Sequence, residues 1–225
     1  MKPFSDYQNP AVAVDLVVFG YSRGQLSVLM LNRKEEPFQD RWTLPGAFVA
    51  INETFQDACT RILSTKLGAA GLYLEQLFTF DDPQRDPRGR VISVAYYALV
   101  NPARFATTAG NMANDVKWFP ITEMPEPGFD HRSILNIALR RLQGKIMYYP
   151  VGFELLDEEF TMSELHQLYE CILSMPIDRR NFSRKILEAN FIEPTGHKRE
   201  GLKNRHPELF RFIKSLKEHH FHLKL

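Results

Sequence analysis

Three arginines fall within six residues of one segment, at Arg85, Arg88 and Arg90, and Asp86 lies among them. A guanidinium group is planar and can donate two parallel hydrogen bonds to a phosphate, a carboxylate or a pair of hydroxyls. This cluster therefore suits an anionic or polyhydroxyl ligand. The same residues could instead form a solvated loop before a strand, and the sequence leaves both interpretations open for each arginine.

A second group of residues has the spacing of a loop followed by a helix. Trp42-Thr43-Leu44-Pro45-Gly46 is followed by Glu53, by Arg61 and by Gly68. This pattern resembles the Nudix box, a loop–helix–loop motif in which a glutamate and a later arginine stand at fixed distances before a closing glycine. The resemblance covers roughly Ala11 to Phe119 and implies a Nudix-like fold for the first half of the chain.

The resemblance also implies roles for individual positions of the helix. Glu53 and Arg61 correspond to the pair that braces the loop against the helix, whereas Ile62, Thr65 and Lys66 stand where the family has its metal-binding glutamates. Nudix hydrolysis uses Mg²⁺, a hard ion that requires oxygen ligands and mostly takes carboxylates. Isoleucine offers no ligand, threonine a weak neutral one and lysine a cation. We therefore expect no hydrolase activity, no bound metal and no cofactor.

The alternative is an active Nudix hydrolase of ADP-ribose or another nucleoside diphosphate derivative, which would have to recruit other acids such as Glu75, Asp81 or Asp86. Nothing in their spacing supports this. The remaining expectation is a pocket that binds a small-molecule effector. Of the neighbours Tyr96 and Tyr97, one is expected to face the core and the other could line the pocket. The candidate effector-binding residues are Arg33, Phe48, Glu53, Arg61, Asp86, Arg88, Arg90 and Tyr96.

The second half of the chain has helical periodicity and predicts a winged helix-turn-helix. Phe160 to Leu165 has the signature of a helix start, with Thr161 as the cap and Glu164 closing the capping box. After a turn, Asp178 can cap a second helix. A strand then starts at Phe191, a basic loop spans Pro194 to Pro207, and Glu208 to Ile213 returns as a strand. Helix, turn, basic helix, strand, loop and strand is the order of a winged helix.

Charge is distributed unevenly along this half. Residues 151–175 carry six acids and no Lys or Arg, while residues 176–217 carry eleven bases against five acids. The basic helix places donor side chains on one outer face, which suits DNA phosphates and base edges. A helical hairpin with a solvated basic face is the alternative, and RNA is disfavoured because the basic face is helical. The candidate DNA-binding residues are Arg179, Arg180, Asn181, Arg184, Lys185, Lys198, Arg199, Lys203 and Arg205.

A degenerate Nudix domain followed by this module resembles the Nudix-related transcriptional regulator family. The resemblance implies a homodimeric bacterial repressor of NAD metabolism or of sugar use, which binds a double-stranded DNA operator. It also implies an effector, ADP-ribose-like or a sugar such as a pentose, that binds the Nudix-like domain and releases the DNA. The wing departs from the family pattern at Asn204-Arg205-His206-Pro207. The segments that carry the resemblance are Phe129–His131, Val151–Leu156, Phe160–Leu165, Arg180–Lys185 and Leu209–Phe212.

Composition limits the class of protein. The chain has 225 residues, 44% of them hydrophobic and 12% aromatic, with a net charge of +1, so disorder of the whole chain is excluded. Its two cysteines, Cys59 and Cys171, lie in apolar-periodic stretches, which excludes a disulfide scaffold and indicates a reducing cytoplasm. The longest apolar run, Ala11 to Phe19, is too short to span a membrane, and the N-terminus lacks the apolar core of a signal peptide.

The order of the predicted elements sets the fold class. We expect an α+β protein, with a Nudix-like α/β/α sandwich built on a mixed sheet, followed by a winged helix-turn-helix domain. Strands are predicted at residues 11–19, 25–32, 91–100 and 115–119, a helix capped by Thr54 at residues 55–63, and a helix capped by Asp130 at residues 131–145. The expected domains are residues 1–128, a linking helix at 129–150 and residues 151–225, with the irregular segment 147–156 as the join.

Overall fold

The computed structural model describes residues 9–68, 72–104, 113–200 and 206–216. Its contacts divide the chain into two units. The first comprises Met1–Val18, Val28–Ala98 and Phe105–Ala138, and the second comprises Phe19–Ser27, Leu99–Arg104 and Leu139–Leu225. Within the described ranges, no helix combines the length and the apolar composition needed to cross a membrane.

Seven strands of the described residues form one sheet, ordered β3-β2-β1-β6-β5, with β4 paired to β1 and β7 paired to β2. The central strand β1 is almost completely buried, and Asp15 is the one acid within it. All four predicted strands are confirmed, at the same or longer bounds. The strands are β1 Ala11–Ser22, β2 Gln25–Arg33, β3 Trp42–Thr43, β4 Gly46–Phe48, β5 Tyr73–Phe80, β6 Val91–Val100 and β7 Ala113–Pro120.

The sequence did not reveal β5, because that strand lies at the edge of the sheet, next to β6. Only Leu77 of its eight residues is buried, so the strand lacks the apolar alternation that identifies a half-buried strand. In β6, Tyr96 and Tyr97 are both buried, with 5% and 0% of their surface exposed. One of the two was expected to be available to line a pocket, but neither tyrosine ring is exposed.

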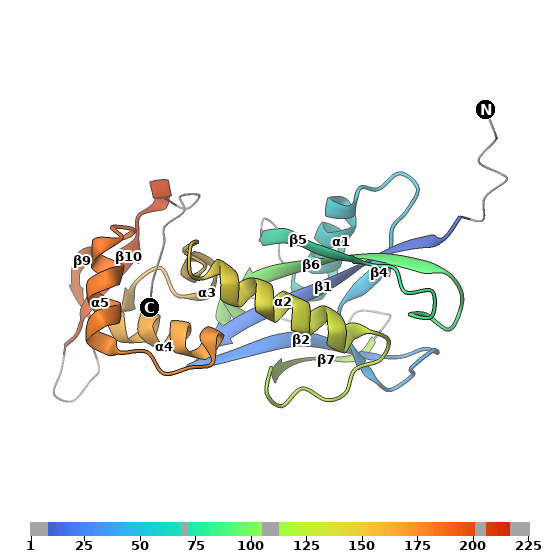
Figure 1. The fold of residues 1–225 in the computed structure, drawn as a ribbon, viewed down its shortest axis with the longest axis horizontal. Coiled ribbons are helices and arrows are strands. Elements are labelled where there is room, and N and C mark those ends of the chain that lie inside the picture. Colours follow the sequence, from blue (N-terminus) through green and yellow to red (C-terminus); the bar gives the residue numbers. More distant parts are fainter. Residues whose placement is uncertain (1–8, 69–71, 105–112, 201–205, 217–225) are drawn as a thin grey trace. The chain divides into compact units, whose positions relative to one another are not determined.

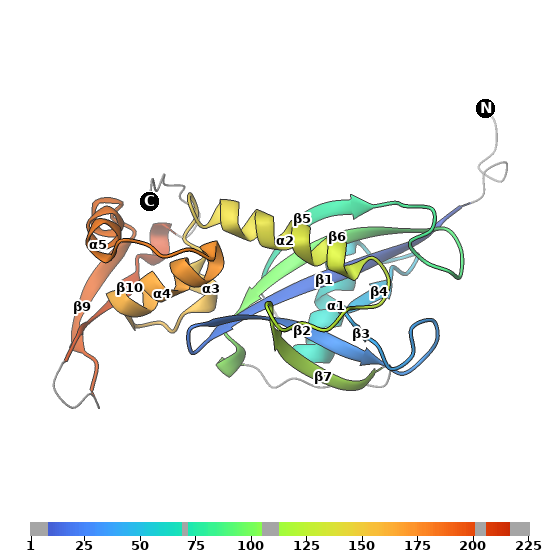
Figure 2. The ribbon, with the colours of Figure 1, turned by 60° about the horizontal axis from the view of Figure 1, so that its bottom comes forward.

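Helix α1 (Phe55–Leu67) follows the predicted capping box. The Thr54 hydroxyl accepts from the Asp57 amide, the Asp57 carboxylate accepts from the Thr54 amide, and Gly68 ends the helix in the left-handed conformation. Helix α2 (His131–Lys145) has the predicted bounds, and the division between the units falls inside it, after Ala138. Figures 1 and 2 show α1 on one face of the sheet and the first part of α2 on the other.

The second unit contains a winged helix with a three-stranded sheet, ordered β8-β10-β9. The ring of Phe212 packs against Phe153 and Phe160 at centroid distances of 4.4 and 4.6 Å. A side chain at Gly152 would place its Cβ 2.5 Å from the Phe212 ring, so this contact requires a glycine. The elements are α3 Gly152–Leu155, β8 Phe160–Thr161, α4 Met162–Leu173, α5 Arg179–Glu188, β9 Ile192–Lys198 and β10 Glu208–Phe212, with short 3-10 turns at Pro102–Arg104 and Lys214–Leu216.

The join at residues 147–156 was expected to be less regular, and it consists of turns around the four-residue helix α3. One local prediction for this unit was wrong. The loop expected from Pro194 starts later, because β9 continues to Lys198 and Pro194 pairs with Phe210. A proline is tolerated there since β9 is an edge strand, where one side needs no backbone donor.

Candidate ligand pocket and nucleic-acid interface

An arginine–aromatic cluster forms in the first unit from Arg33, Phe38, Phe48, Arg88 and Phe129. The rings of Phe38 and Phe129 lie 4.6 Å apart. The Arg33 guanidinium lies 5.1 Å from the Phe129 ring, and that of Arg88 lies 5.4 Å from Phe48 and 5.9 Å from Phe129. Ring faces accept a planar group by stacking, and the cations can pair with an anion attached to it.

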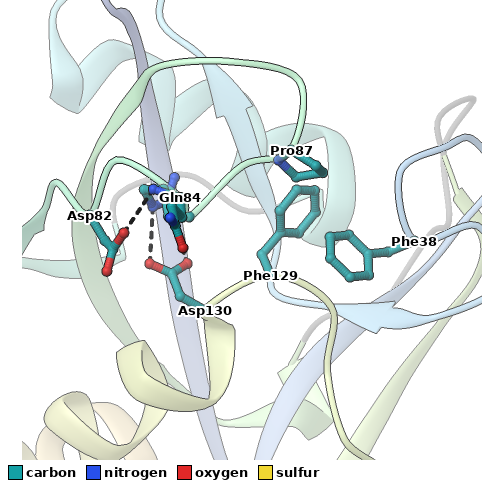
Figure 3. A pocket seen from close by; sticks show the side chains of 7 residues that line it. Phe38, Asp82, Gln84, Pro87, Phe129 and Asp130 are labelled. Carbon is teal, nitrogen blue, oxygen red and sulfur yellow. Dashed lines mark hydrogen bonds and ion pairs between the residues drawn. The ribbon is translucent and has the colours of Figure 1, made fainter.

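A pocket of about 370 Å³ adjoins this cluster. Its volume falls within the range of small-molecule sites, about 300–1,000 Å³. Figure 3 shows the rings of Phe38, Pro87 and Phe129 gathered on one side, with the polar side chains of Gln84 and Asp130 on the other. The pocket is lined by Phe38, Asp82, Gln84, Arg85, Pro87, Phe129 and Asp130.

Arg85 lies at the centre of a buried polar network. Its Nε and Nη2 atoms donate to the two carboxylate oxygens of Asp130 at 3.0 and 2.8 Å, and Nη2 also donates to Asp15 at 2.9 Å. The Ser93 hydroxyl donates to the same Asp15 oxygen at 2.6 Å. Burial alone would raise the pKa of Asp15, but His131, Arg85 and Ser93 hold that pKa below its ordinary value. Asp15 is therefore an anion that the core tolerates because of these donors.

His131 links this network to the loop before β4. Its Nδ1 accepts from the Leu44 amide at 2.9 Å, so the ring proton lies on Nε2, which is 3.4 Å from Asp15. Gly46 stands opposite Asp15 in the β1–β4 register. A Cβ at Gly46 would collide with the Asp15 carboxylate and would lie 3.0 Å from the Val14 carbonyl. The backbone of Leu44-Pro45-Gly46 therefore lies close to Asp15, and position 46 has no room for a side chain.

Glu53 and Arg61 form a two-bonded ion pair. Arg61 Nε and Nη2 donate to the Glu53 carboxylate at 2.7 and 2.8 Å, and Nη2 also donates to the Phe48 carbonyl at 3.2 Å. The Ala50 amide donates to the same carboxylate at 3.1 Å. These bonds tie the loop after β4 to α1. The hydrogen bond from Arg61, with that from Ala50, lowers the pKa of Glu53 to about 2.

We expect Glu53→Gln to be less stable than the wild type at neutral pH and to approach it in acid. Because the folded-state pKa of Glu53 is depressed, its contribution to stability is present above its ordinary pKa of 4.5 and is lost as the pH falls from there toward 2. The measurement is the melting temperature of both proteins from pH 7 downward. A difference in melting temperature between the two proteins that stays constant below pH 4.5 would contradict this account.

The positions that the Nudix resemblance assigns to metal ligands do not fit Mg²⁺. Ile62 is 4% exposed and packs in the core, and the Thr65 hydroxyl donates to the carbonyls of Arg61 and Ile62 at 2.9 and 3.0 Å. Lys66 lies in the last turn of α1. Across the described ranges, no three His, Cys, Asp or Glu side chains gather in a way that could hold a metal ion.

Two of the acids considered for a recruited metal site have other partners for their carboxylates. The Asp86 carboxylate accepts from Arg88 Nη2 at 2.7 Å and from Nε at 3.0 Å. Glu75 accepts a hydrogen bond from the Tyr73 hydroxyl. For Asp81, the bond from Arg90 goes to the backbone carbonyl and not to the carboxylate, and within the described residues no group of three acids, His or Cys gathers around it. These acids therefore supply no ready set of magnesium ligands.

The structure brings some of the predicted effector residues together and leaves others apart. Arg33, Phe48, Asp86 and Arg88 lie in or beside the arginine–aromatic cluster, and the Glu53–Arg61 pair adjoins it through the Phe48 carbonyl. In contrast, Arg90 donates to the Asp81 carbonyl, and the Tyr96 hydroxyl donates to Gln76 at 3.3 Å from a buried ring. The role of each residue in effector binding stays a prediction.

Phe38, Phe129 and Asp130 line the pocket but were not among the predicted effector residues, and Arg85 was predicted only as a member of the arginine cluster, not as the partner of a buried acid. One signal for Arg85 was present. Asp15 interrupts an apolar strand, and a buried carboxylate requires a cation or several donors. The sequence contained that acid but could not indicate which of the many arginines approaches it.

The winged helix presents a basic outer face on α5. The side chains of Phe182 and Ile186 are fully buried on the inner side. Arg179, Arg180 and Arg184 are exposed, while Asn181 and Lys185 are partly covered. Asp178 caps the helix through the Asn181 amide, as predicted. Arg184 donates to Asn181 at 2.9 Å, so the two side chains of this face are already oriented together.

The predicted wing residues differ in how they are held. Lys198 is exposed, whereas Arg199 donates twice to the Glu164 carboxylate, at 2.9 and 2.7 Å. Glu164 also closes the capping box of α4 with Thr161. Arg199 therefore fixes the base of the wing to α4. The predicted contacts of Lys203 and Arg205 lie outside the described residues.

Comparison with known proteins gives the class of the chain. Residues 9–136 match the NUDIX domain family, and residues 152–212 match the NrtR DNA-binding winged helix domain. The chain is thus a Nudix domain, with its mixed sheet and flanking helices, followed by a winged-helix DNA-binding domain. It belongs to the NrtR family of transcriptional regulators, as the pattern of Phe129–His131 and the later segments predicted.

Two relatives, one of them represented by two crystal structures, are similar over most of one or both domains. The ADPR responsive transcriptional repressor NtrR of Acinetobacter baylyi is 31% identical over 212 residues, covering 92% of this chain and 84% of that protein. The crystal structure of Shewanella oneidensis NrtR complexed with a 27mer DNA superposes with a TM-score of 0.79 at 32% identity, covering 95% and 99% of the two chains. The NUDIX domain of that NrtR complexed with ADP ribose superposes with a TM-score of 0.55 at 32% identity, covering 63% of this chain and 94% of that domain.

Proposed function

We propose that this protein is a transcriptional repressor whose winged helix binds operator DNA and whose Nudix domain binds ADP-ribose as an effector. The observation that carries the proposal is that one chain contains both the arginine–aromatic cluster with its adjoining pocket and the exposed basic face of α5. It is supported by the Acinetobacter baylyi relative, which is named as an ADPR responsive transcriptional repressor and aligns with both domains. The proposed domain limits are residues 1–128, 129–150 and 151–225.

ADP-ribose suits the arginine–aromatic cluster better than a free pentose does. Adenine offers a planar face that can stack on Phe38, Phe48 or Phe129, and the diphosphate offers anionic oxygens to Arg33 and Arg88. A pentose has neither group. The ADP-ribose complex of the Shewanella oneidensis NUDIX domain supports the same choice.

The proposed DNA-binding surface is the outer face of α5. Exposed Arg179, Arg180 and Arg184 are close enough in sequence to meet neighbouring phosphates and base edges, with Asn181 as a further donor. The DNA complex of Shewanella oneidensis NrtR supports this assignment. We further propose a homodimer, in which effector binding favours a geometry that no longer matches two half-sites about one helical turn apart.

We also propose that the Nudix domain has lost hydrolysis, since Ile62, Thr65 and Lys66 replace the metal ligands and Ile62 is buried in the core. Incubation of the protein with ADP-ribose in Mg²⁺ or Mn²⁺ should release no AMP. Turnover near about 1 s⁻¹, which is low in the common enzyme range, would instead support an active hydrolase.

The test of the proposed function is a titration of operator DNA in the presence and absence of ADP-ribose. The operator is first selected by the wild-type protein from a random DNA library. We expect saturating ADP-ribose to weaken DNA binding by a factor in the usual range of allosteric coupling, about 5–150-fold. AMP and a free pentose are the controls. If none of these compounds changes the DNA affinity, the protein is not a ligand-responsive repressor of this kind.

A further inference from the structure

The ion pair between Arg85 and Asp130 forms part of the pocket lining. Arg85 is 4% exposed and Asp130 is 22% exposed, and both line the pocket. Each Asp130 oxygen accepts one hydrogen bond from Arg85, at 3.0 and 2.8 Å. A carboxylate oxygen can accept two hydrogen bonds, so Asp130 retains acceptor sites toward the pocket. Figure 3 shows the Asp130 side chain directed into this group of residues.

Asp130 is also the residue immediately before helix α2, which begins at His131. The Asp130 carbonyl accepts from the amides of Ser133 and Ile134, at 2.9 and 3.2 Å. An aspartate at this position commonly caps its helix through its side chain. Here the carboxylate is bonded to Arg85 instead, so the residue that precedes α2 also lines the pocket. The helix then continues past Ala138 into the second unit.

The residues around Asp130 are themselves held by several contacts. Arg85 is bonded to buried Asp15, and the neighbouring His131 is bonded to the Leu44 amide. Phe129, immediately before Asp130, has a φ of 57°, a left-handed conformation that is unfavourable for a residue with a side chain. Its ring is held between Phe38 and His131, at 4.6 and 5.3 Å. A backbone in this conformation persists only because the surrounding contacts hold it.

We propose that the Arg85–Asp130 pair is the contact through which a ligand in the pocket acts on helix α2. The ligand group is a ribosyl or similar vicinal diol, whose hydroxyls donate to Asp130 while Phe38 and Phe129 pack against it. Carboxylates bind ribose hydroxyls in this way in dinucleotide sites. The inference rests on the proposed function, because it concerns how ligand binding changes DNA affinity. Asp130 is a positioning residue, since it acts on DNA binding through α2.

The test compares Asp130→Asn with a matched control. Asparagine keeps the size of Asp130 but removes the charge and half of the acceptor sites. The control is Glu126→Gln, which makes the same change in an exposed carboxylate bonded to Arg132 at 3.0 Å, beside the start of α2 but outside the pocket lining. Calorimetry gives the ADP-ribose concentration that saturates each protein, and fluorescence anisotropy gives its DNA affinity with and without saturating ADP-ribose.

We expect ADP-ribose to change the DNA affinity of the wild type and of Glu126→Gln by the same factor, at least about fivefold. For Asp130→Asn, we expect this factor to fall below about twofold even at saturation. If Asp130→Asn keeps the wild-type factor, the coupling inference is overturned while the proposed function stands. If the wild type itself shows a factor of one, the proposed function fails.

Hydrogen exchange on the wild type keeps the inference testable if Asp130→Asn does not fold. ADP-ribose should change the protection of the backbone amides of Ser133 and Ile134, which are bonded to the Asp130 carbonyl. AMP and free ribose, each added alone, separate the contributions of the adenine nucleotide and of the diol. Unchanged protection of these two amides at saturating ADP-ribose would overturn the proposed contact.

Discussion

Replacement of both Arg180 and Arg184 by alanine is expected to lower the affinity for operator DNA at least about 100-fold. Both side chains are exposed on the outer face of α5, while the inner face is anchored by Phe182 and Ile186. A hydrogen bond to a charged group contributes about 1.5–3 kcal/mol, so the loss of two such contacts corresponds to this factor or more. The measurement is the dissociation constant by fluorescence anisotropy at several salt concentrations.

Salt dependence separates a lost contact from a general change of charge. Each phosphate contact that is lost should reduce the slope of log affinity against log salt by about 0.9. The control removes the same charge elsewhere, by Arg41→Ala with Arg140→Ala, both exposed residues outside the winged helix. If this control loses as much affinity as the α5 variant, then α5 is not the DNA-reading surface.

Replacement of Arg85 by alanine is expected to destabilise the folded protein by about 3–5 kcal/mol, the range for removing one partner of a buried ion pair. The side chains of Arg85 and Asp15 are only 4% and 9% exposed, so both charges are largely removed from water in the folded protein. Asp15 would keep only Ser93 and His131 as partners. Urea unfolding of the variant and the wild type measures the difference.

The control for this prediction is Arg184→Ala. Arg184 and its partner Glu188 have side chains that are 63% and 61% exposed, and such a surface pair contributes only about 0–1 kcal/mol. The same variant also tests whether the DNA-binding loss of the α5 double variant arises from unfolding. A loss of stability at Arg85 as small as at Arg184 would mean that the core accommodates an uncompensated Asp15.

Local signals were predicted well from the sequence. Thr54 with Asp57, and Thr161 with Glu164, form the predicted capping boxes, and Asp178 caps α5. A cap depends on residues three positions apart, so its chemistry is visible in the sequence itself. The family was predictable for a similar reason, because the motifs that identify it have fixed spacings along the sequence.

The pocket was predicted less well, because its residues meet only through tertiary packing. Arg85 is bonded to Asp15 and to Asp130, which lie far from it in the sequence. Periodicity cannot show such pairs. It also cannot show that Tyr96 is buried, or that Arg199 is bonded to Glu164 and is therefore oriented toward α4. These outcomes depend on the angle at which elements pack, and no local pattern contains that angle.

The close approach of Gly46 to Asp15 has a consequence for how relatives of this protein can diverge. A methyl group at position 46 would overlap the carboxylate opposite it and would press on the Val14 carbonyl, so alanine there requires both a smaller side chain at position 15 and a small shift of the backbone. Neither mutation alone is then neutral, since shortening Asp15 first would leave the guanidinium of Arg85 without one of its partners. Lineages should therefore either retain both residues or have replaced both, and descendants with one replaced should be rare.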